Sequence, residues 1–297
     1  MVYFGVFFAG VFGAIIGSFS VAQVWRLRAA ELHDIKKSGG EVDKKEWSKL
    51  KYLISEKHKK NRSHCLRCGY KLQWFDLIPV FSWLSLGGKC RKCHTKIGLL
   101  EFLAEVATAI IFGVIFASMQ VDLIKISAID LFRITLLFLA LSPLVILFVY
   151  DAKWSLLPVK VMWIFNFLAG LYWLSSNFEG GFSATIILNL VVSLALFPGI
   201  YFILSAVSKG AWVGDGDWIL AIGLVFLLPN KPIYTIFLLL FSNLIGLAII
   251  FSQAIVRKKM IKKHAQIPFG PAMILACVVL LTFQPFFVNF LKNLMII

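Results

Sequence analysis

The feature that most constrains this chain is a series of apolar segments, most of them long enough to cross a bilayer. Roughly 17 to 25 apolar residues span the hydrocarbon core as a helix. Seven segments meet this description and an eighth is shorter: 3–24, 102–118, 131–150, 158–174, 182–207, 218–228, 232–256 and 272–290. Hydrophobic residues make up 60% of the chain and the mean hydropathy is +0.85, which excludes an ordinary soluble domain. We therefore predict an all-α polytopic membrane protein with about eight transmembrane helices.

The basic residues predict the orientation of these helices. Lys and Arg between spans collect on the cytoplasmic side, and 18 of the 30 lie in residues 26–96. The remaining clusters lie in 153–160, at Lys209 and in 257–263. If all of them face the cytoplasm, segment 218–228 must also cross and both termini lie outside. The net charge of +15 then reflects orientation and anionic lipid, and we expect no nucleic-acid partner.

These patterns predict three parts. Residues 1–27 form a first transmembrane helix, which we expect to be retained because no basic residue precedes its apolar core. Residues 28–98 form a cytoplasmic, zinc-ribbon-like insertion between the first and second helices. Within it, the basic stretch 41–60 favours a solvated or lipid-surface helix. Residues 99–297 form a seven-helix membrane domain.

Four of the five cysteines form two CxxC pairs in the insertion. Cys65 and Cys68 are separated from Cys90 and Cys93 by 21 residues, which is typical of a zinc ribbon. A reducing cytoplasmic location disfavours two disulfides. We predict a structural Zn²⁺ held by the four thiolates, with the flanking histidines at 64 and 94 as alternative ligands. Cys277 lies in the last apolar segment, where a packing role is favoured.

Two carboxylates near the ends of apolar segments are candidates for chemistry. Asp217 follows Gly214 and Gly216, and Asp151 closes an earlier apolar run, where we expect a short turn before Pro158. Acids within membrane segments are functional by default. Two carboxyl groups held close together share a proton, as in an aspartic protease, and the glycines would let a substrate backbone approach. The residues alone leave helix capping or cation binding equally open.

Other polar residues at segment ends favour structural roles. Glu101 and Glu105 are four apart on one helical face, where solvation at the interface is favoured over binding a cation or ligand. Asp130 and Arg133 are three apart and can form an ion pair. Gly17 is one of several small residues that would let helices approach closely.

The GxGD pattern of residues 214–217 resembles the signature of intramembrane aspartyl proteases, and the wider motif set resembles the type IV prepilin peptidases. The resemblance covers nearly the full chain. Its motifs are Gly17-Ser18-Phe19, Arg26, both CxxC pairs, Trp74-Phe75-Asp76-Leu77-Ile78-Pro79 with Ser82, Gly88-Lys89-Cys90, Glu105, Asp151 with Leu157-Pro158, and Ile267-Pro268-Phe269-Gly270-Pro271.

The resemblance implies a bifunctional enzyme of the bacterial inner membrane. Asp151 and Asp217 would be the catalytic pair, with Asp215 at the variable position of the signature. Such an enzyme removes a short basic leader from type IV prepilins or pseudopilins, after a glycine, with its active site facing the cytoplasm. Many members then methylate the new N-terminus with S-adenosylmethionine, which places Arg26 and Glu105 as candidate cofactor-binding residues.

Three positions depart from the family pattern. Ser20-Val21-Ala22 stands where the family has Leu-Asn-Val, Leu100 replaces a basic residue, and Ile219 replaces a lysine. The first two lie in regions associated with methylation, so a peptidase without methylation is the main alternative. The rival from another class is a cation transporter that uses the same aspartates as ligands.

Overall fold

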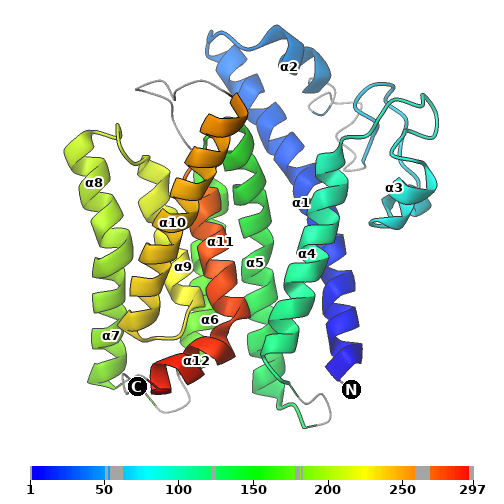
Figure 1. Cartoon of the computed structure of the whole chain (residues 1–297). Coiled ribbons are helices and arrows are strands. Elements are labelled where there is room, and N and C mark those ends of the chain that lie inside the picture. The colour runs from blue at the N-terminus through cyan, green and yellow to red at the C-terminus, as the bar shows by residue number, and fades with distance from the viewer. Residues whose placement is uncertain are drawn as a thin grey trace. The chain divides into compact units, whose positions relative to one another are not determined.

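The described part of the chain folds into helices and the loops that join them (Figure 1). The structure is a computed structural model and describes residues 2–50, 53, 63–121, 125–177, 181, 183–257 and 268–293. The helical elements in chain order are α1 (Val2–Lys37), α2 (Lys44–Leu50), η3 (Trp74–Leu77), α3 (Phe81–Ser85), α4 (Leu99–Ser118), α5 (Ala128–Trp154), α6 (Val159–Asn177), α7 (Ala184–Leu194), η4 (Ala195–Gly199), α8 (Ile200–Ser208), α9 (Asp215–Leu227), α10 (Pro232–Arg257), α11 (Gly270–Thr282) and α12 (Gln284–Asn293). The predicted all-helical class is confirmed.

Five helices are long and apolar enough to cross a membrane, or six if the bent pair α11 and α12 is one span. The angle between α11 and α12 is 71°. The predicted segments 158–174 and 218–228 correspond to α6 and α9, which are not among the five. A multi-pass membrane protein is thereby supported, while the number eight stays a prediction.

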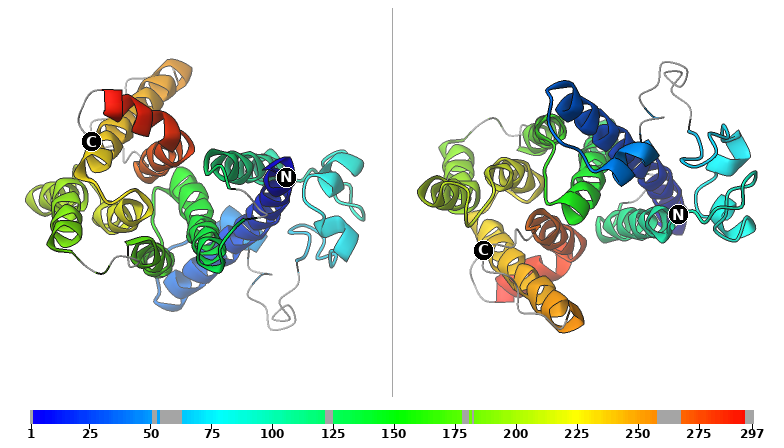
Figure 2. Two further views of the ribbon diagram at one scale, coloured as in Figure 1. Left: turned by 90° about the horizontal axis from the view of Figure 1, so that it is seen from below. Right: turned by 90° about the horizontal axis from the view of Figure 1, so that it is seen from above.

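The chain divides into two compact units, residues 6–113 and residues 114–297 with the first five residues. In the larger unit the helices pack in a closed ring, seen end on in Figure 2. α5 packs on α6, α6 on α9, and α9 on the α7, η4 and α8 segment; α10 packs on that segment and on α11, and α11 returns to α5. α9 and α11 also touch across the ring. This arrangement brings elements that are distant in sequence around one interior.

Helix α5 extends further than the sequence indicates. Asp151 was expected in a turn between two spans, but it lies in the last turn of α5, which continues to Trp154. The helix ends where Ser155 takes a left-handed conformation, with φ 52°, and donates its N–H to Asp151 O at 2.8 Å. Leu157 precedes a proline, which disfavours further helix there. Asp151 is therefore held by helical backbone rather than by a loop.

The α7 and α8 helices are joined through a π-helical turn, η4, which contains Pro198. Proline has no N–H to donate and clashes with the carbonyl group one turn earlier in an α-helix. A π turn accommodates both effects within a continuous helix. Phe197 and Pro198 are buried in this turn. Because such turns change the register of the residues that follow, η4 sets the direction in which α8 presents its side chains.

In the smaller unit α1 continues to Lys37, well beyond residue 27. Thr108 of α4 donates its hydroxyl to Gly13 O at 2.7 Å, and a β-carbon at Gly17 would lie 2.8 Å from Ala104 O. The expected close helix packing at Gly17 is confirmed. Leu50, at the end of α2, is buried against Ala29 and Leu32 of α1, so this part of the basic stretch packs on protein. Residues 51, 52 and 54–60 of that stretch lie outside the described residues.

Candidate active site and metal centre

Asp151 is buried near the end of α5, with 4% of its surface exposed. The N–H of Gly270, the first residue of α11, donates to Asp151 Oδ2 at 2.9 Å. A β-carbon at position 270 would lie 2.6 Å from the same oxygen. Only glycine therefore lets this backbone N–H reach the carboxylate.

Asp217 lies in the first turn of α9 and is 7% exposed. Its Oδ2 accepts the N–H of Gly214 at 3.0 Å, so the loop before the helix closes onto the carboxylate. The neighbouring Asp215 is exposed, and its Oδ1 accepts a hydrogen bond from the buried Ser205 hydroxyl of α8 at 2.5 Å. A hydrogen bond to a charged group contributes about 1.5 to 3 kcal/mol. It fixes the start of α9, and with it the position of Asp217, against α8.

The two carboxylates belong to one site. The charge of Asp217 acts on the Asp151 carboxyl. The Leu157 side chain packs against the first turn of α9 and the first residue of α11. A β-carbon at Gly216 would lie 3.0 Å from the Leu157 side chain, and one at Gly270 would lie 3.4 Å from Leu157 Cδ2. Because α5 ends here while α9 and α11 begin here, the same end of the larger unit supplies both acids (Figure 1). Gly216 thus has a packing partner in addition to its expected role in substrate approach.

Sequence reasoning assigned no role to several residues that build this site. Gly270 was part of a motif that carried the resemblance, yet nothing in its spacing from Asp151 indicates a hydrogen bond. Leu157 also stood in one of those motifs without an assigned role, and Ser205 was not singled out, because an ordinary hydroxyl residue carries no signature of its own. Ile267, at the start of the same motif, and most of the basic cluster 257–263 lie outside the described residues.

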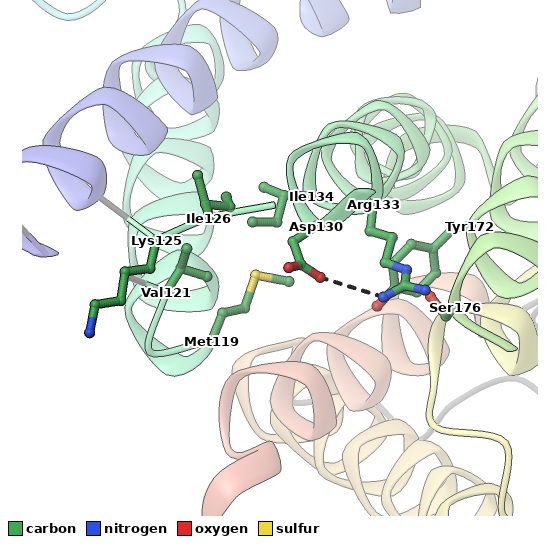
Figure 3. Close-up of a pocket in the computed structure, with 9 residues that line it drawn as sticks. All are labelled: Met119, Val121, Lys125, Ile126, Asp130, Arg133, Ile134, Tyr172 and Ser176. Atoms are coloured by element: carbon green, nitrogen blue, oxygen red, sulfur yellow. Dashed lines mark hydrogen bonds and ion pairs between the residues drawn. The ribbon is translucent and has the colours of Figure 1, made fainter. Parts of the chain in front are cut away.

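A separate cavity of about 360 Å³ lies at the far end of α5 (Figure 3). It is lined by Asp130 and Arg133 of α5 and by Tyr172 and Ser176 of α6, with Met119 and Lys125 nearby. The predicted pair is confirmed: Arg133 Nη1 lies 3.4 Å from Asp130 Oδ1. Arg133 also donates twice to Ser175 O, at 3.0 and 2.8 Å. Since the 21 residues from 130 to 151 rise about 31 Å in a helix, this cavity is remote from the aspartates.

The four cysteines of the smaller unit form a cluster that could hold a metal. All four Sγ atoms lie within 4.8 Å of one another. Cys65 and Cys93 Sγ are 3.8 Å apart, and Cys68 and Cys90 Sγ are 4.0 Å apart. These separations are too long for disulfides, whereas a tetrahedral Zn²⁺ with Zn–S bonds of about 2.3 Å requires about 3.8 Å between sulfurs. The thiols therefore fit a tetrahedral ion.

Each cysteine pair is carried by the same local turn. Gly69 N donates to Cys65 O at 3.0 Å and His94 N donates to Cys90 O at 2.9 Å. Gly69 and His94 both have positive φ, 70° and 53°. His94 thus occupies the left-handed position of its turn. The cluster found among the described residues contains the four cysteines and neither flanking histidine, which favours the four-cysteine set.

The environment of Cys93 prepares it for metal binding. Hydrogen bonds from the side chain and the backbone of Thr95 lower the pKa of Cys93 from 9.0 to about 6. The Thr95 Oγ1 atom lies 3.3 Å from Cys93 Sγ. Because metals bind the thiolate, a lowered pKa means that less proton must be displaced at neutral pH.

The candidate cofactor residues Arg26 and Glu105 lie on α1 and α4. Arg26 is half-buried, and Glu105 is only 8% exposed, so the expectation that Glu105 is solvated is wrong. Glu105 Oε2 accepts the N–H of Val80 at 2.7 Å, and Ser18 also donates to this carboxylate. Val80 has φ 63°, a strained conformation for a β-branched residue. Glu105 therefore holds a strained turn of the insertion.

Glu101 has a different arrangement from Glu105. Trp25 Nε1 donates to Glu101 Oε1 at 3.2 Å. Its second oxygen, Oε2, is buried and has no hydrogen-bond partner among the described residues. Of the two acids, Glu101 is the one with a buried oxygen left for a cationic ligand.

Fold and site together define a multi-pass helical membrane protein with a buried pair of carboxylates and a four-thiol cluster that could hold a metal. Residues 11–119 match the family model described as Bacterial Peptidase A24 N-terminal domain. This match covers the cysteine cluster and ends before either aspartate.

Curated relatives extend the similarity over most of the chain. The prepilin leader peptidase/N-methyltransferase of Dichelobacter nodosus is 27% identical over 92% of this chain and 89% of its own length. The protein of that name from Neisseria gonorrhoeae is 28% identical over 91% and 87%. The one from Vibrio cholerae is 35% identical, over 43% of this chain and about half (49%) of the relative. The chain is thus similar over most of its length to proteins named prepilin leader peptidase/N-methyltransferase. No solved structure gives a significant match.

Proposed function

We propose that this protein is an intramembrane aspartyl endopeptidase that removes the leader peptide of type IV prepilins or pseudopilins. The observation that carries the proposal is the pair Asp151 and Asp217, both buried at one end of the larger unit and in electrostatic contact. The names of the relatives supply the substrate class, since each is a prepilin leader peptidase.

The chemistry follows from two carboxyl groups that share one proton. The ionised member takes a proton from a water molecule as the water oxygen attacks the scissile carbonyl carbon, and the protonated member donates to the carbonyl oxygen. The resulting tetrahedral diol then expels the amine when the C–N bond breaks, and the nitrogen takes up the proton first removed from water. Hydrogen bonds from Gly270 and Gly214 hold one oxygen of each carboxylate, which leaves the other oxygen for this exchange.

The site is proposed to face the cytoplasm of a bacterial inner membrane. The support is the concentration of 18 of the 30 Lys and Arg residues in 26–96, which favours a cytoplasmic location by the positive-inside rule. A basic leader would remain on that side. The active site and the uncleaved leader then meet without moving charge across the bilayer.

The four thiolates of Cys65, Cys68, Cys90 and Cys93 are proposed to hold a structural Zn²⁺, supported by their separations. Methylation of the new N-terminus is proposed as a second activity, since the relatives are named N-methyltransferases. S-adenosylmethionine supplies a methyl group on a positively charged sulfur. A buried, unpartnered oxygen of Glu101 is chemically suited to a cation, with Arg26 and Glu105 on the same two helices.

The decisive experiment replaces each aspartate by asparagine and follows leader removal from a prepilin in membranes. Asp151→Asn and Asp217→Asn should each lower the cleavage rate by at least about 10²-fold, because each removes one partner of acid–base catalysis. The matched control is Asp130→Asn, an acid on the same helix in the remote ion pair, which should leave the rate unchanged. Cleavage by either aspartate variant at the wild-type rate would refute the dyad.

The same reaction mixture, supplied with labelled S-adenosylmethionine, reports the second activity. Label on the new N-terminus of the cleaved pilin supports the bifunctional enzyme. Cleavage with no transfer of label leaves a peptidase alone.

A further inference from the structure

A tyrosine on α8 is placed beside the aspartate site but has no part in the chemistry above. Tyr201 is 3% exposed and is the second residue of α8, which follows the π turn η4. Its ring packs edge-on against Phe197, at 5.1 Å between centroids, and lies tilted against Phe269, at 5.5 Å. The phenol is therefore fixed by two aromatic neighbours rather than free to rotate.

The Tyr201 hydroxyl is held by a residue of another helix. Asn243 Nδ2 of α10 donates to the hydroxyl oxygen at 3.3 Å, and its amide is anchored by a second bond to Leu239 O at 2.8 Å. A hydroxyl that accepts from Asn243 directs its own hydrogen elsewhere. Among the described residues no acceptor for that hydrogen is found.

The position of this hydroxyl relative to the carboxylates is set by contacts on both sides. The charge of Asp217 acts on Tyr201. Phe269, which packs on the tyrosine ring, immediately precedes Gly270, the residue that binds Asp151. The Phe269 ring also packs closely on α10 at Gly246. A β-carbon at position 246 would lie 2.8 Å from this ring, so a larger residue there would displace it. Tyr201 thus faces the same interior as the pair.

Asn243 is itself an unusual residue for its place. It is exposed on α10, one of the helices apolar enough to cross a membrane. A polar side chain on a spanning helix is retained when it bonds across helices. The Asn243 and Tyr201 pair therefore connects the exposed side of α10 to the buried tyrosine.

We propose that the Tyr201 hydroxyl, held by Asn243, donates a hydrogen bond to the carbonyl oxygen of the scissile peptide bond. This inference rests on the proposed peptidase function. As water attacks, negative charge grows on that oxygen until the protonated aspartate delivers its proton, and a fixed donor stabilises the growing charge. No proton leaves Tyr201. Asn243 is a positioning residue, which keeps the hydroxyl oriented.

The test compares Tyr201→Phe with Tyr234→Phe in the full-length protein, using a prepilin substrate. Tyr234 is 2% exposed and lies near the start of α10, about 14 Å of helix before Asn243, so it controls for loss of a buried hydroxyl. Tyr201→Phe should lower kcat by about 10²-fold with KM little changed, since the bond is strongest in the transition state. Tyr234→Phe should leave kcat unchanged.

A second readout separates charge stabilisation from a merely structural role. A peptide difluoroketone, which hydrates to a diol resembling the intermediate, should lose affinity for Tyr201→Phe, while binding of the unreactive amide peptide stays the same. Asn243→Leu should lower kcat about tenfold, and Asn243→Gln, which keeps the donor, should recover part of it. If Tyr201→Phe changes the thermal unfolding temperature, the two Asn243 variants test the role of the hydroxyl in its place. Equal kcat in Asn243→Leu and wild-type protein would then overturn the assignment.

The possible failures are distinguishable. If wild-type protein cleaves and Asp217→Asn does not, but Tyr201→Phe keeps its kcat within about threefold, the tyrosine assignment is overturned and the peptidase stands. If Asp217→Asn cleaves as wild type does, the aspartate pair is refuted and the tyrosine assignment falls with it. If wild-type protein does not shorten the prepilin, the peptidase proposal itself fails.

Discussion

The aspartate site and the cysteine cluster are assembled by opposite routes. Asp151 and Asp217 come from α5 and α9, and a third helix, α11, supplies the N–H that holds Asp151. Each cysteine pair instead lies within one tight turn closed by its own backbone, through Gly69 in one case and His94 in the other.

This difference determines what holds each site together. The carboxylates depend on helix packing, so a clash of one atom at a helix start can displace a carboxylate oxygen. The thiols depend on two preformed turns and on the ion that would join them, because binding energies of about 10 to 16 kcal/mol are typical of structural zinc. We therefore expect the first site to be sensitive to packing and the second to metal.

The largest effect is expected at Gly270. Gly270→Ala would place a β-carbon 2.6 Å from Asp151 Oδ2, so the carboxylate or α11 must move. A displacement of about 1 Å can lower a rate by 10²-fold, and we expect at least that loss of kcat in prepilin cleavage.

Gly170→Ala on α6 provides the matched control for Gly270→Ala. Its nearest neighbours would be Phe226 ring atoms at 3.9 and 4.0 Å, an ordinary contact, so kcat should be unchanged. Full activity in Gly270→Ala would show that Asp151 does not need its backbone partner.

More of the cysteine cluster than of the aspartate site could be predicted from the sequence. The CxxC spacing contains the local geometry of the thiol turns, so the four-cysteine cluster could be predicted from sequence. The carboxylate pair was predicted as a pair, but Gly270 and Ser205 could not be, because their contacts exist only once α11 and α8 have packed. Periodic apolar segments predicted the helices, while their ends depended on local conformations such as that of Ser155.

The smaller unit shows the same limit of prediction. The spacing of Glu105 and Glu101 on one helical face predicts that the Glu105 carboxylate is solvated. In the structure it is buried and accepts a hydrogen bond from the backbone of Val80, 25 residues earlier, in a turn with positive φ that no propensity indicates. Contacts of this kind are set by tertiary structure and leave no periodic trace.

Loss of one thiol should separate the two sites. Cys68→Ser should reduce bound zinc from one ion per chain to near zero, since a three-thiol set binds more weakly. Prepilin cleavage should fall less than about threefold, because the contacts of both aspartates come from other helices. Metal analysis of the purified protein and the cleavage assay give the two measurements.

The control for Cys68→Ser is Cys277→Ser, which removes a buried cysteine outside the cluster and should leave zinc content unchanged. If Cys68→Ser stopped cleavage as completely as Asp217→Asn, the two sites would not be separable.

The smallest effect concerns the local tuning of Cys93. In metal-free protein its pKa is lowered to about 6 by Thr95, so the reactive thiolate is present at high pH and is lost only as pH falls through about 6. Alkylation of Cys93 by iodoacetamide, followed by peptide mass spectrometry, should therefore keep its rate from pH 9 to pH 7 and decline below. Thr95→Val should move the midpoint upward, and Thr95→Ser, which retains the hydroxyl, should not. A midpoint near the ordinary thiol value in wild-type protein would mean that the turn alone does not prepare Cys93, and that the thiol site, like the carboxylate site, needs contacts beyond its own turn.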